Sequence, residues 1–69
     1  MKTKLGQNIR AAREAKGLGR SSLGILLGVD GHTIYRWERG ETVPRIPMLE
    51  QLAEALGTTA PKLLSKGGV

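Results

Sequence analysis

Cationic and polar side chains recur at helical spacing within residues 28–40, in the stretch GVDGHTIYRWERG. At about 100° per residue, His32, Arg36 and Arg39 fall on one side of a helix through this stretch. The opposite side carries Ile34, Trp37 and Glu38. One side therefore suits an anionic ligand, which it can meet with charge and hydrogen bonds, and the other suits packing against the rest of the protein.

The residues that border this helix indicate where it begins and ends. Asp30 occupies an N-cap position, where its carboxylate can accept hydrogen bonds from the first-turn N–H groups. Gly40 can end the helix in a left-handed conformation. A second short helix is expected over residues 20–27, followed by a turn at Gly28. Two helices joined by such a turn form a helix-turn-helix, here over about residues 20–39.

Gly24 lies inside the expected helix 20–27, where glycine costs about 1 kcal/mol relative to alanine. The two helices of a helix-turn-helix cross at about 90–120°, and a small residue lets them meet. The other interpretation is a weak helix that merely tolerates glycine. On the first interpretation, alanine at position 24 is tolerated or mildly stabilising, whereas leucine displaces the neighbouring helix.

Apolar residues at helical spacing predict three further helices. The first covers residues 2–16 and ends at Gly17, and another runs from Ile46 to a stop at Gly57. A last turn or two covers residues 60–64, and the tail 65–69 is expected to fray. No alternating strand pattern competes with these helices, so the chain is predicted to be all-α with five short helices.

Two kinds of inward-facing residue are expected. The first kind is apolar: the predicted core consists of Leu5, Ile9, Leu23, Leu27, Val29, Ile34, Trp37, Leu49, Leu52 and Leu56. Ile46 is also in register with the apolar residues of its helix. Arg13 lies beside the stripe of the first helix and needs an acid, for which Glu38 is the candidate. An Arg13–Glu38 ion pair is therefore predicted. Ile25 points outward, as an isolated apolar side chain or as a dimer contact.

Length and composition exclude several classes of protein. The 69 residues form one domain at most, over residues 1–69. Without cysteine and with His32 as the single histidine, no disulfide framework or ordinary zinc site can be built, and no metal or other cofactor is expected. No apolar run approaches the roughly 18 residues of a membrane span, and a secretory signal is absent, so a soluble cytoplasmic protein is expected.

An enzyme is not expected. Ser21, Ser22 and His32 offer hydroxyls and an imidazole, but no geometry that would orient them for catalysis is indicated, and so small a domain has no space for a sizeable cleft.

The net charge of +5 is unevenly distributed along the chain: residues 1–45 hold nine Lys or Arg against four Asp or Glu, and residues 46–69 hold two against two. Such an excess of positive charge is typical of proteins that bind nucleic acid, although a basic composition can also serve solubility.

The chain resembles the Cro/cI-type helix-turn-helix family, the xenobiotic-response-element class that includes lambdoid phage repressors. The resemblance covers about residues 5–64 and is carried by Leu5-Gly6-Gln7-Asn8-Ile9-Arg10, Arg13, Lys16-Gly17-Leu18, Leu23, Leu27-Gly28-Val29, Ile34, Trp37-Glu38-Arg39-Gly40, Pro44 and Leu52-Ala53-Glu54-Ala55-Leu56-Gly57. It implies a compact five-helix lambda-repressor-like domain. In the family, the helix that begins near Gly31 lies in the major groove, and most members bind two-fold symmetric operators as dimers.

The sequence departs from the family pattern at four positions, which are Gly19, Arg20, Gly24 and Gly31. Arg20 stands where a phosphate-contacting Gln is common, and it keeps a donor and adds a full charge. Gly31 stands where relatives often read a base with a side chain. The resemblance and the charged face therefore assign base reading to His32, Thr33, Tyr35 and Arg36, and phosphate contacts to Arg20, Ser21, Arg39 and Arg45.

The function expected from this resemblance is sequence-specific binding to double-stranded DNA by a transcriptional regulator, a repressor of phage, mobile-element, antitoxin or controller type. The expected partners are an operator duplex and a second copy of the chain, in a prokaryotic cytoplasm or nucleoid. The alternative is a protein-interaction adaptor that uses the same fold without reading DNA. The charged face with Arg36 and His32, opposite Ile34 and Trp37, favours the first function.

Overall fold

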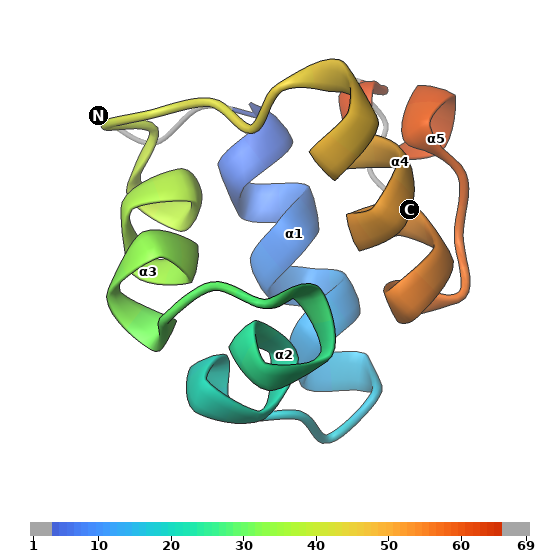
Figure 1. Cartoon of the computed structure of the whole chain (residues 1–69). Coiled ribbons are helices and arrows are strands. Elements are labelled where there is room, and N and C mark those ends of the chain that lie inside the picture. The colour runs from blue at the N-terminus through green and yellow to red at the C-terminus, as the bar shows by residue number, and fades with distance from the viewer. Residues whose placement is uncertain (1–3, 66–69) are drawn as a thin grey trace.

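The computed structural model describes residues 4–65, which form five α-helices and no strand. The helices are α1 (Lys4–Ala15), α2 (Arg20–Leu27), α3 (Gly31–Arg39), α4 (Ile46–Leu56) and α5 (Ala60–Leu64). In Figure 1, α1 runs through the middle of the molecule, with α3 on one side, α2 beneath, and α4 and α5 on the other side. The all-α prediction with five helices is confirmed. Residues 66–69 of the tail predicted to fray, and residues 2–3 of the first predicted helix, lie outside the described residues.

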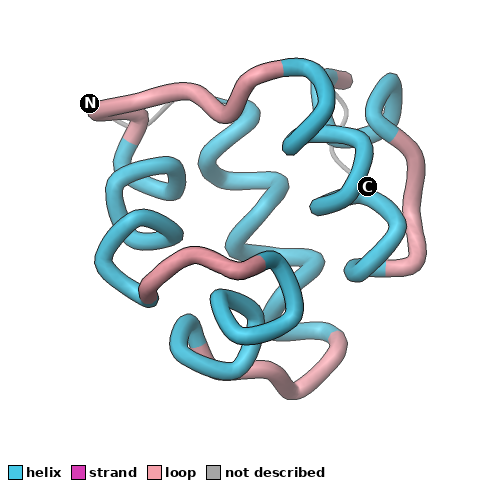
Figure 2. The backbone as a smooth tube through the Cα atoms, in the orientation of Figure 1, coloured by secondary structure: helices cyan, strands magenta, loops and turns pink. Residues whose placement is uncertain are grey.

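Short loops join the helices (Figure 2), and local capping accounts for the sharp turn between α2 and α3. Gly28 ends α2 with φ of 76°, a left-handed conformation that side chains rarely adopt. Asp30 then caps α3, because its Oδ1 accepts hydrogen bonds from the backbone N–H and the hydroxyl of Thr33, both at 2.8 Å. These bonds lower the pKa of Asp30, the larger effect coming from the hydroxyl. The predicted N-cap is confirmed.

Side chains from all five helices meet in one core. Its buried apolar residues are Ile9, Ala12, Leu23, Leu27, Ile34, Trp37, Leu49, Leu52, Ala53, Leu56 and Leu63. Two of the predicted core residues, Leu5 and Val29, are only partly buried and pack at its edge. Leu63 was not among the predicted core residues, yet it is fully buried.

The position expected for Ile46 is wrong. Its side chain is 72% exposed, because it begins α4 and so precedes the turn at which the stripe of Leu49, Leu52 and Leu56 meets the core. Helical spacing alone places Ile46 beside that stripe, but the first turn extends past the edge of the packed layer. Val43 and Leu64 are also more than half exposed.

A polar contact fixes the end of the chain against its beginning. The buried side chain of Asn8 in α1 donates from Nδ2 to the carbonyl of Leu63 at 2.7 Å and to that of Ser65 at 2.9 Å. These bonds satisfy carbonyls at the end of α5, a helix too short to be stable by itself. α5 therefore belongs to the same folded unit as the helix-turn-helix.

Two glycines permit close backbone approaches. A Cβ at Gly6 in α1 would overlap the carbonyl oxygen of Glu38 and lie 2.7 Å from that of Trp37, so α1 touches the last turn of α3 directly. A Cβ at Gly24 would overlap the carbonyl oxygen of Val29. The tight approach expected at Gly24 is therefore present, but it is made to the backbone of the turn. The expectation that alanine is tolerated there is wrong for this backbone, because the turn would have to move.

Candidate nucleic-acid interface

The two sides of α3 differ as the sequence predicted. His32 and Arg36 are exposed, and Thr33 and Tyr35 are partly buried at the border of the outward side. On the inward side Ile34, Trp37 and Glu38 are buried. Among the described residues, neither Arg36 nor His32 forms an ion pair with a carboxylate. The outward side thus presents a cation and an imidazole that are available to a ligand.

The predicted Arg13–Glu38 ion pair is present and connects α1 to α3. Arg13 donates from Nε to Oε2 of Glu38 at 2.6 Å and from Nη2 to Oε1 at 3.3 Å, and the two side chains are 8% and 2% exposed. Arg13 also donates from Nη1 to the carbonyl of Leu18 at 2.8 Å. Such bidentate geometry with additional hydrogen bonds is what makes a buried charge pair tolerable.

Arg20 has a role that the sequence did not reveal. Its Nε donates to Oε1 of Glu38 at 3.0 Å, so a single buried carboxylate receives arginines from both α1 and α2. The Arg20 side chain is 38% exposed, and within residues 4–65 this is its only hydrogen bond to a side chain. The bond orients the guanidinium while leaving its Nη1 and Nη2 atoms for another acceptor.

Two arginine guanidinium groups lie near the ring of Tyr35. The guanidinium carbon of Arg20 is 5.1 Å from the centroid of the Tyr35 ring, and that of Arg39 is 5.5 Å from it. Arg39 also donates from Nη1 to the Tyr35 hydroxyl at 2.9 Å, a bond that raises the pKa of Arg39. The ring of His32 stacks on that of Tyr35, with the two ring centroids 5.9 Å apart. Tyr35 thus links base-reading and phosphate-contacting candidates.

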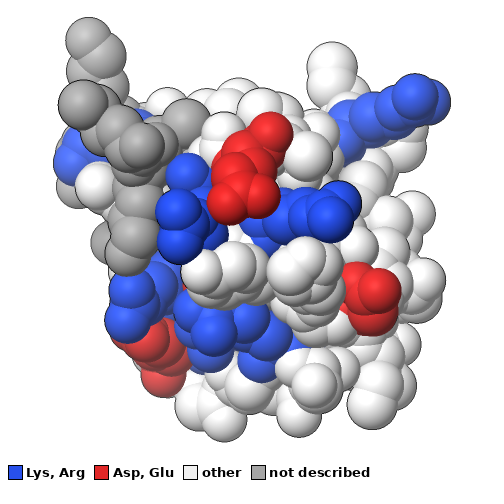
Figure 3. Space-filling view, turned by 90° about the vertical axis from the view of Figure 1, so that its left-hand side faces the viewer, with Lys and Arg blue, Asp and Glu red and all other residues white. Residues whose placement is uncertain are grey.

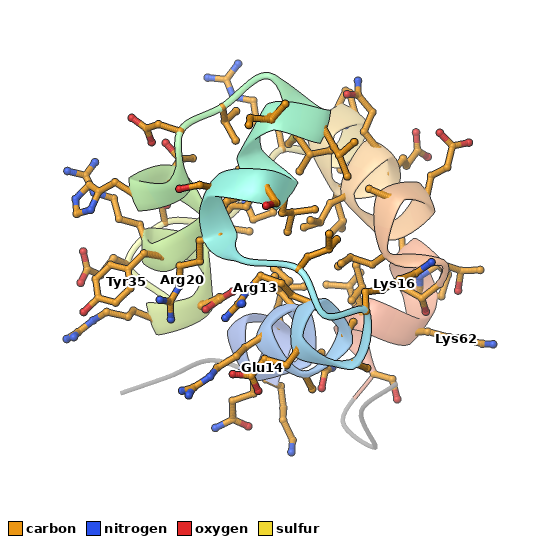
Figure 4. All side chains as sticks on the ribbon, turned by 90° about the horizontal axis from the view of Figure 1, so that it is seen from below. Arg13, Glu14, Lys16, Arg20, Tyr35 and Lys62 are labelled. Carbon is orange, nitrogen blue, oxygen red and sulfur yellow. The ribbon has the colours of Figure 1, made fainter. Side chains whose placement is uncertain are left out.

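A depression of about 130 Å³ lies where α1, α2 and α3 meet. It is lined by Arg10, Arg20, Tyr35, Glu38 and Arg39. Figure 3 shows Lys and Arg side chains gathered on the side of the molecule that carries α3, with a few acidic side chains among them. Figure 4 shows Arg20 beside Tyr35 on this side, with Arg13 further in.

The remaining candidate residues lie at the borders of this face. Ser21 is exposed in the first turn of α2 and adjoins the start of α3, because a Cβ at Gly31 would lie 3.4 Å from its Oγ. Arg45 is exposed at the N-cap of α4, and no hydrogen bond or ion pair joins it to the other candidates within the described part of the chain. The structure therefore groups Arg20, Tyr35 and Arg39 and leaves Arg45 separate.

Arg10 is a cation of this face that sequence reasoning missed. It lines the depression and pairs through Nε with Glu14 at 3.1 Å, one turn further along α1. The hydrogen bond from Arg10 lowers the pKa of Glu14 below its usual range. The helical spacing of Arg10 and Arg13, with Leu5 and Ile9 marking the inward side, was the signal that could have found it.

Within residues 4–65, no helix is long and apolar enough to cross a membrane.

Comparisons with known proteins agree with this geometry. Residues 4–64 match the model of the helix-turn-helix domain family. The chain is 40% identical over 63 residues to repressor protein C2 of Salmonella phage P22, covering 91% of this chain and 29% of that protein. It is 38% identical over 52 residues to a candidate HTH-type transcriptional regulatory protein of Pyrobaculum aerophilum, covering 75% of this chain and 21% of that protein. The chain thus spans less than a third of either relative.

Solved structures with this fold include a repressor and an enzyme. The P22 c2 repressor in complex with a synthetic operator superposes with a TM-score of 0.85 at 35% identity, over 90% of this chain and 94% of that one. Hydroxypropylphosphonic acid epoxidase from S. wedmorenis superposes with a TM-score of 0.87 at 28% identity, over 97% of this chain but 36% of that one. The fold therefore occurs both in a repressor and as part of an enzyme chain.

Proposed function

Since this chain belongs to the helix-turn-helix domain family, we propose that it is a sequence-specific, double-stranded DNA-binding regulator of the repressor type. The observation that carries the proposal is the division of α3, whose inward side is anchored through Glu38 while Arg36 and His32 project from its outward side. An α-helix of this kind fits the major groove of B-DNA, where base edges can be distinguished. The P22 c2 repressor, which shares this fold, was solved on a synthetic operator.

Base reading is assigned to the outward side of α3. Arg36 has the donor fork that pairs with guanine O6 and N7, and His32 and Thr33 offer shorter hydrogen-bonding groups beside it. Tyr35 is restrained by Arg20 and Arg39, so its ring edge is the part that can contact a thymine methyl. Gly31 leaves the start of the helix without a side chain, which lets the backbone come close to the DNA.

Phosphate contacts are assigned to the border of this face. Arg20 is oriented by Glu38, and its Nη atoms can bind a phosphate oxygen bidentately. Ser21 follows Arg20 in the first turn of α2, Arg39 lines the same depression as Arg20, and Arg45 is exposed at the N-cap of α4. Such contacts fix the position of the protein on the duplex and make affinity dependent on salt, whereas the contacts of α3 give specificity.

Dimer formation and location are also proposals. A homodimer on a two-fold symmetric operator would present two copies of α3 to successive major grooves, about 34 Å apart. This assembly would regulate transcription in the prokaryotic cytoplasm or nucleoid. No cofactor or catalytic group is part of the proposal.

A selection from a random duplex library tests the function directly. The protein is expected to enrich one sequence with two related half-sites, and sedimentation should give two chains per enriched duplex. Binding to the enriched duplex should exceed binding to random DNA by about a thousandfold or more. A library that stays unenriched, with equal affinity for all duplexes, would contradict sequence-specific regulation.

A second function is supported by the epoxidase structure, in which a domain of this fold occupies about a third of an enzyme chain. By analogy, this chain would act as an adaptor in a longer protein and would not read DNA. The same selection separates the two functions, because an adaptor enriches no duplex even at low salt.

A further inference from the structure

A groove lies between the end of α1 and the turn that joins α4 to α5. Its volume is about 430 Å³. Ala12, Ala15 and Lys16 line it from α1, with Leu56 at the end of α4 and Lys62 in α5 opposite them. In Figure 4, Lys16 and Lys62 lie on the other side of the molecule from Arg20 and Tyr35. The groove is thus separate from the face proposed to contact DNA.

The floor and the rim of this groove differ in chemistry. Ala12 and Leu56 belong to the core and bring apolar carbon to the floor, and Ala15 extends that surface at the end of α1. The rim carries the exposed ammonium groups of Lys16 and Lys62. A small apolar surface between two cations matches an apolar side chain flanked by carboxylates.

The two lysines also differ from the arginines of the opposite face. Arg10, Arg13, Arg20 and Arg39 each pair with a glutamate. Within residues 4–65, no ion pair or side-chain hydrogen bond involves the ammonium group of either Lys16 or Lys62. The chain supplies a carboxylate for most cations near α3 and none for those on this groove.

The side chain of Lys16 lies close to Gly57, and its ammonium group has no ion pair within residues 4–65. A Cβ at Gly57 would lie 3.2 Å from its Cε and 3.4 Å from its Nζ, so the side chain extends over the end of α4. The C-terminal end of a helix favours a nearby cation, which accounts for the direction of the side chain. A helix end carries only about half a charge, so the ammonium retains most of its attraction for an anion.

We propose that this groove binds an acidic amphipathic segment of a partner protein. An apolar side chain of the segment lies on Ala12, Ala15 and Leu56, and flanking Asp or Glu side chains pair with Lys16 and Lys62. The apolar floor distinguishes this occupant from nucleic acid, whose phosphates would gain nothing from it. Because the groove is on the other side from Arg20 and Tyr35, the partner and a DNA duplex can be bound at the same time.

The test uses a fluorescein-labelled peptide with leucine at every fourth position and Asp or Glu between, and the complete 69-residue protein in ¹⁵N-labelled form. The peptide should shift the amide resonances of Ala12, Ala15, Lys16 and residues 56–58. The double variant Lys16→Glu, Lys62→Glu should bind it about tenfold or more weakly. The matched control is Lys4→Glu, an exposed lysine about 18 Å away along α1, which should keep the affinity.

Further arms use the wild-type protein and so do not depend on the folding of a variant. Replacing the leucines of the peptide by serine should abolish the shifts, and an excess of duplex DNA should leave the peptide bound. Four outcomes overturn the proposal: no shifts at millimolar peptide, shifts on α2 and α3 instead, binding that is indifferent to leucine, or displacement by DNA. Self-association in sedimentation that shifts the same resonances would also overturn it, since the occupant would then be a second copy of this chain.

Discussion

The inward and outward sides of α3 use the same residue types for different purposes. On the inward side, Arg13 and Arg20 converge on the buried carboxylate of Glu38, so charge fixes the helix in the fold. On the outward side, Arg36 is exposed and has no carboxylate partner within residues 4–65. An arginine that the fold pairs with a carboxylate is thus structural, and an arginine without such a partner is available for a ligand.

This difference predicts that stability and DNA affinity depend on different sides of one helix. Changes on the inward side should unfold the protein or displace α3, and lose affinity only as a consequence. Changes on the outward side should leave stability nearly unchanged and alter binding directly. Tyr35 and Arg20 lie between the two sides and should show both effects.

The largest effect is expected from breaking the inward network. Glu38→Ala leaves Arg13 buried without its anion, and Arg13→Ala leaves the Glu38 carboxylate with Arg20 alone; each should cost about 3–5 kcal/mol of unfolding free energy. The variant with both changes should cost much less than the sum, because neither charge is then stranded. Urea unfolding of the four proteins measures this cycle.

A control uses a pair that does not connect helices. Arg10→Ala removes the exposed partner of Glu14 within α1 and should shift the unfolding midpoint little. Additive losses for Arg13→Ala and Glu38→Ala, or a loss at Arg10 as large as at Arg13, would show that the inward network does not hold α3.

The next effect concerns the backbone contact that supports the same side of α3. Gly6→Ala forces a Cβ against the carbonyls of Glu38 and Trp37 and should cost about 1–3 kcal/mol, since either α1 or α3 must move. The control is Gly19→Ala, where a Cβ meets nothing within 4 Å. Urea unfolding should show a clear loss for the first variant and a small change for the second; equal changes would contradict a tight α1–α3 contact.

The smallest effect is expected at the start of α3. Because the folded-state pKa of Asp30 lies below its usual value of 3.8, its contribution to stability is complete well above that pH and is lost as pH falls through the lower folded-state pKa. Asp30→Asn keeps a capping acceptor and removes the titration. The variant should therefore lose less stability than wild type as the pH is lowered from neutral to below 3.8, as measured by thermal unfolding. A parallel decline of the two proteins would contradict the cap.

Much of the fold followed from the sequence because its signals are local. Glycines at positions 17, 28, 40 and 57 follow the ends of α1 to α4, and the predicted bounds, 20–27 for α2 and about 31–39 for α3, agree with the structure. The Arg13–Glu38 pair was also predictable, since both positions fall on apolar stripes where an unpaired charge would be costly. Helical period and capping chemistry thus determine the elements.

The features that the sequence did not reveal depend on contacts between distant segments. Asn8 reaches the carbonyls of Leu63 and Ser65 across more than fifty residues, and nothing in the local pattern indicates that bond. Arg20 was assigned to phosphate from its place at a helix start, and its bond to Glu38 depends on how α2 crosses α3. Exposure of Ile46 likewise follows from where the packed layer ends.

The central claim is that the outward side of α3 reads DNA bases, and Arg36→Ala tests it most directly. Binding of the wild type, Arg36→Ala and Arg20→Ala should be measured on the enriched duplex and its single-base variants at several salt concentrations. Arg36→Ala should keep wild-type stability within about 0.5 kcal/mol, lose about 1–3 kcal/mol on the enriched duplex and relax discrimination at one base pair per half-site. Arg20→Ala should weaken all duplexes alike and reduce the salt slope by about one. If Arg36→Ala weakened every duplex equally and kept the base preference, Arg36 would be a phosphate contact and the claim would be wrong.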